Sequence, residues 1–189
     1  MRATLLTGLL ILLWTCAHAQ EPQQTNPGPQ RSDFRFEASF ITDGEDYPSR
    51  IAVKGYTTQH SSPCMEVEHE LVERLAGTPG ADVAAIWVDD EIDINFDGFP
   101  DLLIFIGRNS VGRIEDYYAA YVWDEENKCL ALVPGFDEIP NPEFHADSKT
   151  ITSSTRTDAA EKTTWTYVWD GWQLEIIDEK ISNLFDDDE

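Results

Sequence analysis

Apolar and polar residues alternate along much of this chain, and a period of two residues is that of a β-strand with one buried face. In "FRFEASFIT", residues 34–42, every second position from Phe34 to Phe40 is apolar. The stretch "RIAVKGYT", residues 50–57, repeats the alternation after a turn-forming segment, "DGEDYPS". The pattern therefore predicts two neighbouring strands near the start of the folded part.

The next two stretches of the chain differ in how clearly their apolar spacing distinguishes a strand from a helix. "CMEVEHELVERLAG", residues 64–77, fits both a strand and a helix, and we expect a strand at 64–70 followed by a short helical turn. Its histidine, His69, is expected on a solvated strand face and not as a ligand. "LLIFIG", residues 102–107, is a nearly continuous apolar run and predicts a strand buried on both faces.

A four-residue unit, "YVWD", occurs at 121–124 and again at 167–170. Each copy is followed by a polar turn and a second apolar stretch, which predicts two similar hairpins. "KTITSSTRT", residues 149–157, adds another strand, so that about eight to ten short strands are expected and helix is nearly absent. The predicted fold class is all-β and antiparallel, in a propeller-like arrangement or, failing that, a β-sandwich.

The first nineteen residues have the features of a secretory signal peptide. Arg2 precedes an apolar core that is too short to span a bilayer, and "AHA" offers a small-residue cleavage site before Gln20. A lipoprotein signal ending at Cys16 is the alternative, although Trp14 and Thr15 stand where such a signal prefers small residues. Export is predicted, to the periplasm or out of the cell.

Composition divides the rest of the chain into three parts. Residues 20–33 are rich in Pro, Gln and polar residues and predict a flexible leader. Residues 34–180 contain enough apolar and aromatic material for a single β-domain. Residues 181–189 end in "NLFDDDE" and predict an acidic tail.

The chain is strongly acidic, with 36 Asp and Glu against 13 Lys and Arg and a net charge of −23. Loss of residues 1–19, which contain Arg2 and no acid, changes this to −24. A surface of this sign repels nucleic acid and anionic lipid, and it attracts cations and basic proteins. Solubility alone is the alternative explanation of the charge.

Two cysteines, Cys64 and Cys129, remain after the predicted cleavage. An even pair without CxxC spacing in an oxidising compartment predicts one disulfide more readily than a metal or redox site. Two separate buried thiols are the alternative.

The stretch "DINFDGFPDLL", residues 93–103, has the residue types of a calcium-binding loop. Calcium takes six to eight oxygen ligands, and acid or amide side chains alternate here before Gly98, which permits a left-handed turn. The predicted ligands are the side chains of Asp93, Asn95, Asp97 and Asp101 and the backbone carbonyl of Phe99. The closing Glu and the flanking helices of an EF-hand are missing, so the pattern is that of a compact loop between strands.

An acid-rich hairpin whose Asp and Asn side chains only cap backbone groups is the alternative to a calcium site. Magnesium prefers fewer protein ligands and zinc prefers His or Cys, so Ca²⁺ is the predicted ion. The mature chain has histidines at 60, 69 and 145 in no metalloprotease or triad pattern, and it lacks a nucleophile elbow and a phosphate loop. We therefore predict a structural ion in a protein that is not an enzyme.

The loop and the segments that follow it occur in a particular order. "DINFDGFPDL" is followed by "YYAAYVWD" at 117–124, "NPEF" at 141–144, "KTITSSTR" at 149–156 and "TYVWDGWQLEII". In this order the chain resembles the calcium-binding periplasmic lysozyme-inhibitor-type proteins with an interrupted β-propeller fold, over roughly residues 64 to 177. The resemblance implies an exported, calcium-dependent, propeller-like module, some of whose relatives bind and inhibit C-type lysozyme. The residues of the family's inhibitory loop are not carried over to this chain, and the partner-binding residues stay unknown.

Three functions are compatible with these observations. The first is a protein-binding inhibitor of a basic cell-wall hydrolase such as lysozyme, because the negative charge complements a basic partner. The second is a calcium-stabilised adhesion or envelope-assembly module without an enzyme target. The third is a hydrolase that uses two facing carboxylates in a deep cleft, for which the sequence offers no motif.

Overall fold

The computed structural model describes residues 29–42, 44, 48–58, 61–72, 87–109, 114–156 and 158–183. The predicted signal peptide, most of the leader and the tail beyond Asn183 lie outside these residues. The same holds for most of the helical turn predicted after residue 70. No helix within the described ranges is long and apolar enough to span a membrane.

The strands form three antiparallel sheets, and each sheet takes its strands in sequence order. The first sheet, which follows the 3-10 turn η1 (Arg31–Asp33), contains β1 (Phe34–Ile41), β2 (Arg50–Thr57) and β3 (Met65–Glu70). The central sheet contains β4 (Val88–Asp89), β5 (Leu102–Asn109), β6 (Glu115–Asp124) and β7 (Cys129–Leu132). The third sheet, which follows the 3-10 turn η2 (Phe136–Glu138), contains β8 (Glu143–His145), β9 (Thr150–Arg156), β10 (Glu161–Asp170) and β11 (Gln173–Asn183).

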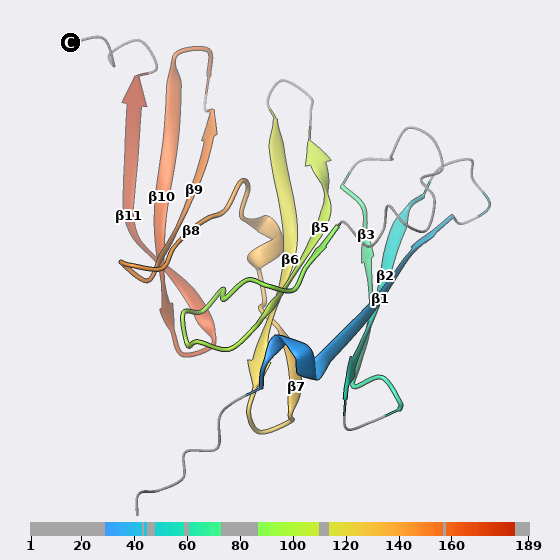
Figure 1. Cartoon of the computed structure of the whole chain (residues 1–189). Helices are drawn as coiled ribbons and strands as arrows, with labels where there is room; N and C mark the ends of the chain where they lie inside the picture. The colour runs from blue at the N-terminus through green and yellow to red at the C-terminus, as the bar shows by residue number, and fades with distance from the viewer. Residues whose placement is uncertain are drawn as a thin grey trace, which may run out of the picture.

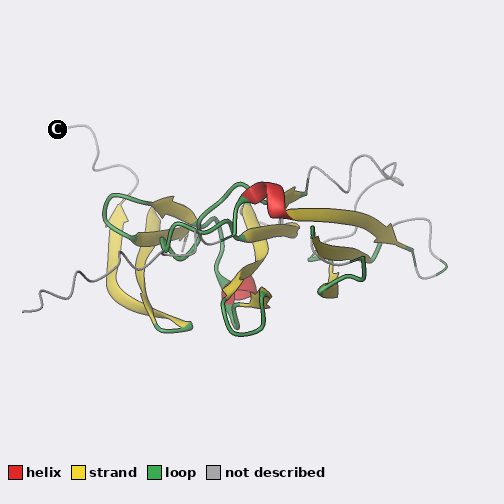
Figure 2. Ribbon diagram, turned by 60° about the horizontal axis from the view of Figure 1, so that its bottom comes forward, coloured by secondary structure: helices red, strands yellow, loops and turns green. Residues whose placement is uncertain are grey.

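The three sheets follow one another along the molecule, with the central sheet in the middle (Figures 1 and 2). One face of the central sheet packs on the first sheet, where Leu102 and Ile104 join Ile51 and Val53 in one apolar core. The opposite face packs on the third sheet through a second core. Because β5 and β6 contribute alternate side chains to both cores, the central sheet is buried from two sides.

The local patterns explain most of these strands. In β1 the even positions from Phe34 to Phe40 face the core, and in β2 Ile51, Val53 and Gly55 are buried. Gly55 lies opposite both Phe36 and Met65 in the sheet. A Cβ at residue 55 would stand 3.2 Å from the Phe36 ring, so a glycine is needed where the two side chains crowd the middle strand.

The all-β antiparallel prediction is confirmed. A meander of consecutive strands is the arrangement of a propeller blade, and the described strands form no closed barrel. The described residues contain eleven strands where eight to ten were expected, because β4 and β8 are too short to show alternation. β11 runs to Asn183, three residues beyond the predicted end of the domain.

Both predicted "YVWD" hairpins are present. Tyr121–Asp124 ends β6 before the turn to β7, and Tyr167–Asp170 ends β10 before the turn to β11. In the first hairpin, Asp124 accepts hydrogen bonds from the backbone amides of Glu126 and Asn127, the usual reason for an Asp at a turn.

Candidate functional site

The predicted calcium loop connects β4 to β5 in the central sheet. Gly98 has φ 88°, so the left-handed turn predicted from the glycine is confirmed. Phe96 also has a positive φ, of 60°, and its side chain is buried with Ile94 in the second core. The apolar residues of the loop thus point inward, which leaves the alternate acid and amide residues on the outer side.

The outer side chains of the loop bond to its own backbone. Asp93 accepts hydrogen bonds from the backbone N–H of Asp97, at 3.1 Å, and from that of Gly98, at 2.9 Å. The Asn95 side-chain carbonyl also accepts from the Asp97 N–H, and Asp97 accepts from the N–H of Phe99 at 2.8 Å. Asp93, Asn95 and Asp97 are therefore brought together around one turn.

Asp101 follows that turn along the chain and is almost fully buried. Its carboxylate accepts hydrogen bonds from the backbone N–H groups of Ile94 at 2.7 Å, Asn95 at 3.3 Å and Trp123 at 3.0 Å. Burial raises the pKa of Asp101 to about 7, against the lowering effect of the Ile94 and Trp123 amides. The carboxylate thus ties the start of the loop to β6.

Two side chains hold the loop from the other side, one from β10 and one from the turn between β8 and β9 of the third sheet. The indole N–H of Trp169, on β10, donates to the carbonyl of Ile94 at 3.0 Å. The ammonium of Lys149 donates to the carbonyl of Phe96 at 3.2 Å. Phe99 packs against the first core, so the loop contacts both cores as well as the third sheet.

The oxygen-only donor set fits a hard cation such as calcium. A carboxylate has about four acceptor positions, so one or two amide hydrogen bonds leave Asp93 and Asp97 with lone pairs for a metal. Within the described residues, however, no three His, Cys, Asp or Glu side chains lie close enough together to hold an ion. The turn brings together the carboxylates of Asp93 and Asp97 and the side-chain amide of Asn95, while the Asp101 carboxylate accepts hydrogen bonds from backbone amides. The ligand set Asp93, Asn95, Asp97, Phe99 and Asp101 stays a prediction.

The disulfide prediction is confirmed. Cys64 and Cys129 are bonded, with their Cα atoms 6.0 Å apart and a separation of 65 positions along the chain. Cys64 immediately precedes β3, and Cys129 begins β7. The bond therefore joins the first sheet to the central sheet.

The solvated position predicted for His69 is wrong. The side chain lies on the inner face of β3, and its Nε2 is 2.7 Å from the hydroxyl of Tyr121 on β6. Burial lowers the pKa of His69, which favours the neutral ring. Alternation was recognised correctly in this strand, but Met65, Val67 and His69 form the covered face and the three glutamates the solvated one.

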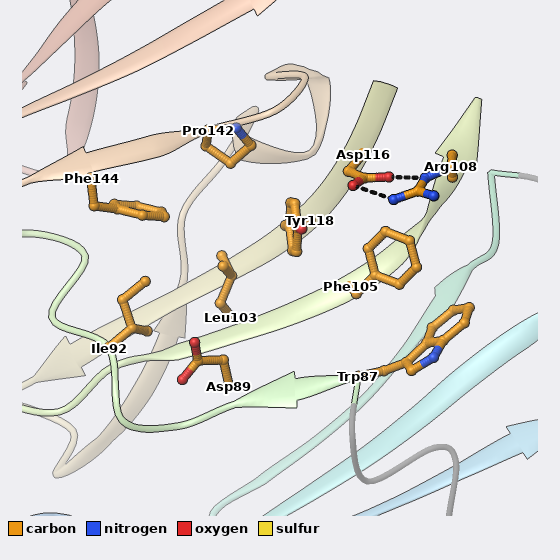
Figure 3. A pocket seen from close by; sticks show the side chains of 10 residues that line it. All are labelled: Trp87, Asp89, Ile92, Leu103, Phe105, Arg108, Asp116, Tyr118, Pro142 and Phe144. Carbon is orange, nitrogen blue, oxygen red and sulfur yellow. Dashed lines mark hydrogen bonds and ion pairs between the residues drawn. The ribbon is translucent and has the colours of Figure 1, made fainter. Parts of the chain in front are cut away.

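A groove of about 470 Å³ opens on the face of the central sheet that turns toward the third sheet (Figure 3). Phe105 and Tyr118 lie opposite each other on β5 and β6, and their rings are 5.4 Å apart. Trp87 contacts the Phe105 ring at 4.6 Å, and Pro142 and Phe144 of the third sheet line the far side.

Charged groups stand at the margins of this groove. The guanidinium of Arg108 pairs with both carboxylate oxygens of Asp116, one of them at 2.8 Å. Asp89, at the end of β4, is also part of the wall and exposed. The sequence does not predict this groove, because the apolar run 102–107 indicates burial on both faces, whereas Phe105 is only half buried.

Comparison with known proteins adds the fold and no more. Neither a family model nor a curated protein matches the chain. A solved structure described as that of a Xanthomonas type IV secretion system related protein matches with a TM-score of 0.52 and 14% sequence identity. The match covers 82% of this chain and 80% of that one. The two chains share a fold.

Proposed function

We propose that this chain is an exported protein that binds and inhibits a basic cell-wall hydrolase of the C-type lysozyme kind. The observation that carries the proposal is the charge of the molecule, −23 over 189 residues. Such a charge steers a basic protein into contact and raises its association rate. The ordered motifs of the lysozyme-inhibitor-type family support the same proposal.

Several further observations fit export. A disulfide between two sheets is typical of proteins that fold in an oxidising compartment. The protein of similar fold is related to a type IV secretion system, which agrees with a role of this chain at the cell envelope. The signal-peptide pattern of residues 1–19 also agrees with export and with a place at the cell envelope.

Calcium is the proposed structural ion of this protein. Asp93, Asn95 and Asp97, with the carbonyl of Phe99, would hold it on the outer side of the loop. When bound, the ion supplies positive charge that offsets the repulsion between the Asp93 and Asp97 carboxylates. The chain's own residues then fix the loop: Asp101 anchors it to β6, and Trp169 anchors it to the third sheet.

A lysis assay tests the proposal directly. Purified residues 20–189 are added at increasing concentration to C-type lysozyme and a peptidoglycan suspension, at physiological salt, with either calcium or a chelator. We expect a dose-dependent loss of lysis that reaches completion near equimolar protein and weakens on chelation. A negatively charged, unrelated protein of similar pI serves as the control for nonspecific charge effects. No inhibition at micromolar protein would refute the proposal.

One observation favours a second function, that of an envelope-assembly module. The edge strand β11 exposes Ile176, Ile177 and Ile181 as well as the nearby Trp172, each about half exposed or more. An edge strand with apolar side chains is a template for pairing with another chain. Recovery of a surface protein from envelope extract by the wild type, and its loss in an Ile176→Lys variant, would support this function over inhibition.

A further inference from the structure

We propose that the aromatic groove between the central and third sheets receives a cationic side chain, an arginine foremost, from the surface of a basic protein partner. The inference deepens the proposed function, on which the identity of the partner rests. It assigns the contact to one place on the molecule.

The floor of the groove suits a planar cation. The half-buried rings of Phe105 and Tyr118 stand side by side on adjacent strands and both line the groove. An arginine placed over such rings is attracted by their negative faces, and its guanidinium stacks on them better than an ammonium does. The groove is also rigid, because Phe105 contacts Trp87, which in turn contacts Phe40 of the first sheet at 5.1 Å.

The charges at the margin are unbalanced in favour of a cation. Arg108 is already paired with Asp116, so these two groups offset each other. Asp89 has no ion pair among the described residues, and only its Oδ1 accepts a hydrogen bond, from the backbone N–H of Glu91 at 3.1 Å. An incoming guanidinium would therefore find one uncompensated carboxylate beside two aromatic rings.

The hydroxyl of Tyr118 adds an acceptor to the same place. The described residues offer it no hydrogen-bond partner, and its ring lies between the charges of Asp116, Arg108 and Asp89, all of which act on its pKa. Burial is the main cause that raises the pKa of Tyr118, so the hydroxyl stays neutral. A neutral hydroxyl accepts a hydrogen bond from a guanidinium N–H.

The size of the groove and the charge at its margin favour a cationic side chain over other occupants. A groove of about 470 Å³ is in the range that holds one or two side chains or a small ligand. A second copy of this chain carries the same net charge of −23 and is repelled. A neutral glycan also stacks on aromatic rings, but it gains nothing from the unpaired Asp89 charge.

Two variants with the same change in net charge separate this contact from general attraction. Asp89→Asn alters the groove, and Glu175→Gln alters an exposed residue of β11, the strand of the third sheet farthest from β8. Each raises the net charge by one, so long-range steering changes equally. The association rate, the dissociation rate and the Kd of each variant on immobilised C-type lysozyme are measured at physiological salt. We expect Asp89→Asn to raise Kd about fivefold or more, mainly through faster dissociation, and Glu175→Gln to change Kd less than about twofold. Equal effects of the two variants would overturn the groove as the contact.

A second experiment does not depend on lysozyme. An acetylated arginine dipeptide amide and a neutral chito-oligosaccharide are each titrated into the ¹⁵N- and ¹³C-labelled wild type, and ring and amide shifts are followed by NMR. We expect the arginine peptide to move the Phe105 and Tyr118 ring signals and to lose this effect in Asp89→Asn. Shifts spread over the acidic surface would overturn the proposal, as would groove shifts produced by the oligosaccharide and not by the peptide. If lysozyme fails to bind the wild type, the proposed function fails, and the peptide titration alone decides whether the groove binds a cation.

Discussion

Removing the disulfide tests how the first and central sheets are held together. Cys64 and Cys129 close a loop of 65 residues, and the chain-entropy relation for a loop of that length gives a stabilisation of roughly 4 kcal/mol. The double variant Cys64→Ala/Cys129→Ala loses this constraint on the unfolded chain. For a domain of about 150 residues, each kcal/mol corresponds to about 2–4 °C, so the melting temperature should fall by roughly 8–16 °C.

Urea unfolding followed by tryptophan fluorescence measures the change in the free energy of unfolding. Cys129 is buried, so its replacement by Ala also removes some packing. The wild type unfolded with and without a reductant provides the control, because reduction breaks the bond without changing the side chains' volume. We expect the reduced wild type and the double variant to agree within about 1 kcal/mol.

Hydrogen exchange locates the effect. The bond joins the start of β3 to β7, so the amides of the first sheet should lose protection before those of β5 and β6, which both cores cover. A loss of less than about 1 kcal/mol on reduction would refute the reasoning, since it would mean that the unfolded chain gains little freedom when the bond is cut.

The remaining predictions concern the loop and the buried titratable groups. Calcium at a hundredfold excess over Kd should raise the free energy of unfolding of the wild type by about 2.7 kcal/mol, which scanning calorimetry measures. The Asp97→Ala variant should not respond to calcium. If that variant responds as the wild type does, calcium binds elsewhere than in this loop. The pKa of Asp101 is about 7 in the folded protein and near 3.8 in the unfolded chain, so the folded state binds more protons between these two pH values. The stability of the metal-free protein should therefore fall as the pH rises from 4 to 7. The Asp101→Asn variant has no carboxyl group at this position, so its stability should depend less on pH in this range. The folded-state pKa of His69 is lowered instead, so its contribution is present above about pH 6.5 and is lost as pH falls, which NMR titration of the ring should show. Tyr121→Phe removes the hydroxyl that contacts His69 and should cost about 1 kcal/mol in urea unfolding; a neutral effect would mean that water replaces the contact.

Local signals in the sequence determined the strands and the turns. Alternation of apolar residues identified β1, β2 and β3, and the repeated aromatic unit identified two hairpins, because the period of two follows from the geometry of a single strand. Gly98 in the predicted left-handed turn needed no partner elsewhere in the chain. The disulfide was predictable because two cysteines without CxxC spacing remain in a chain that is expected to be exported to an oxidising compartment.

Only the tertiary structure decided which face of each strand is covered and what lies opposite it. Alternation is symmetric, so it placed His69 on one of two faces of β3 without saying that Tyr121 of another sheet would cover that face. The spacing predicts Asp101 as a metal ligand, and only the approach of β6 shows that its carboxylate also accepts a hydrogen bond from the Trp123 amide. The groove lies where the packing of the third sheet on the central sheet leaves Phe105 and Tyr118 partly uncovered. Such a gap depends on how two sheets that are distant in sequence pack together, and no local sequence pattern contains this information.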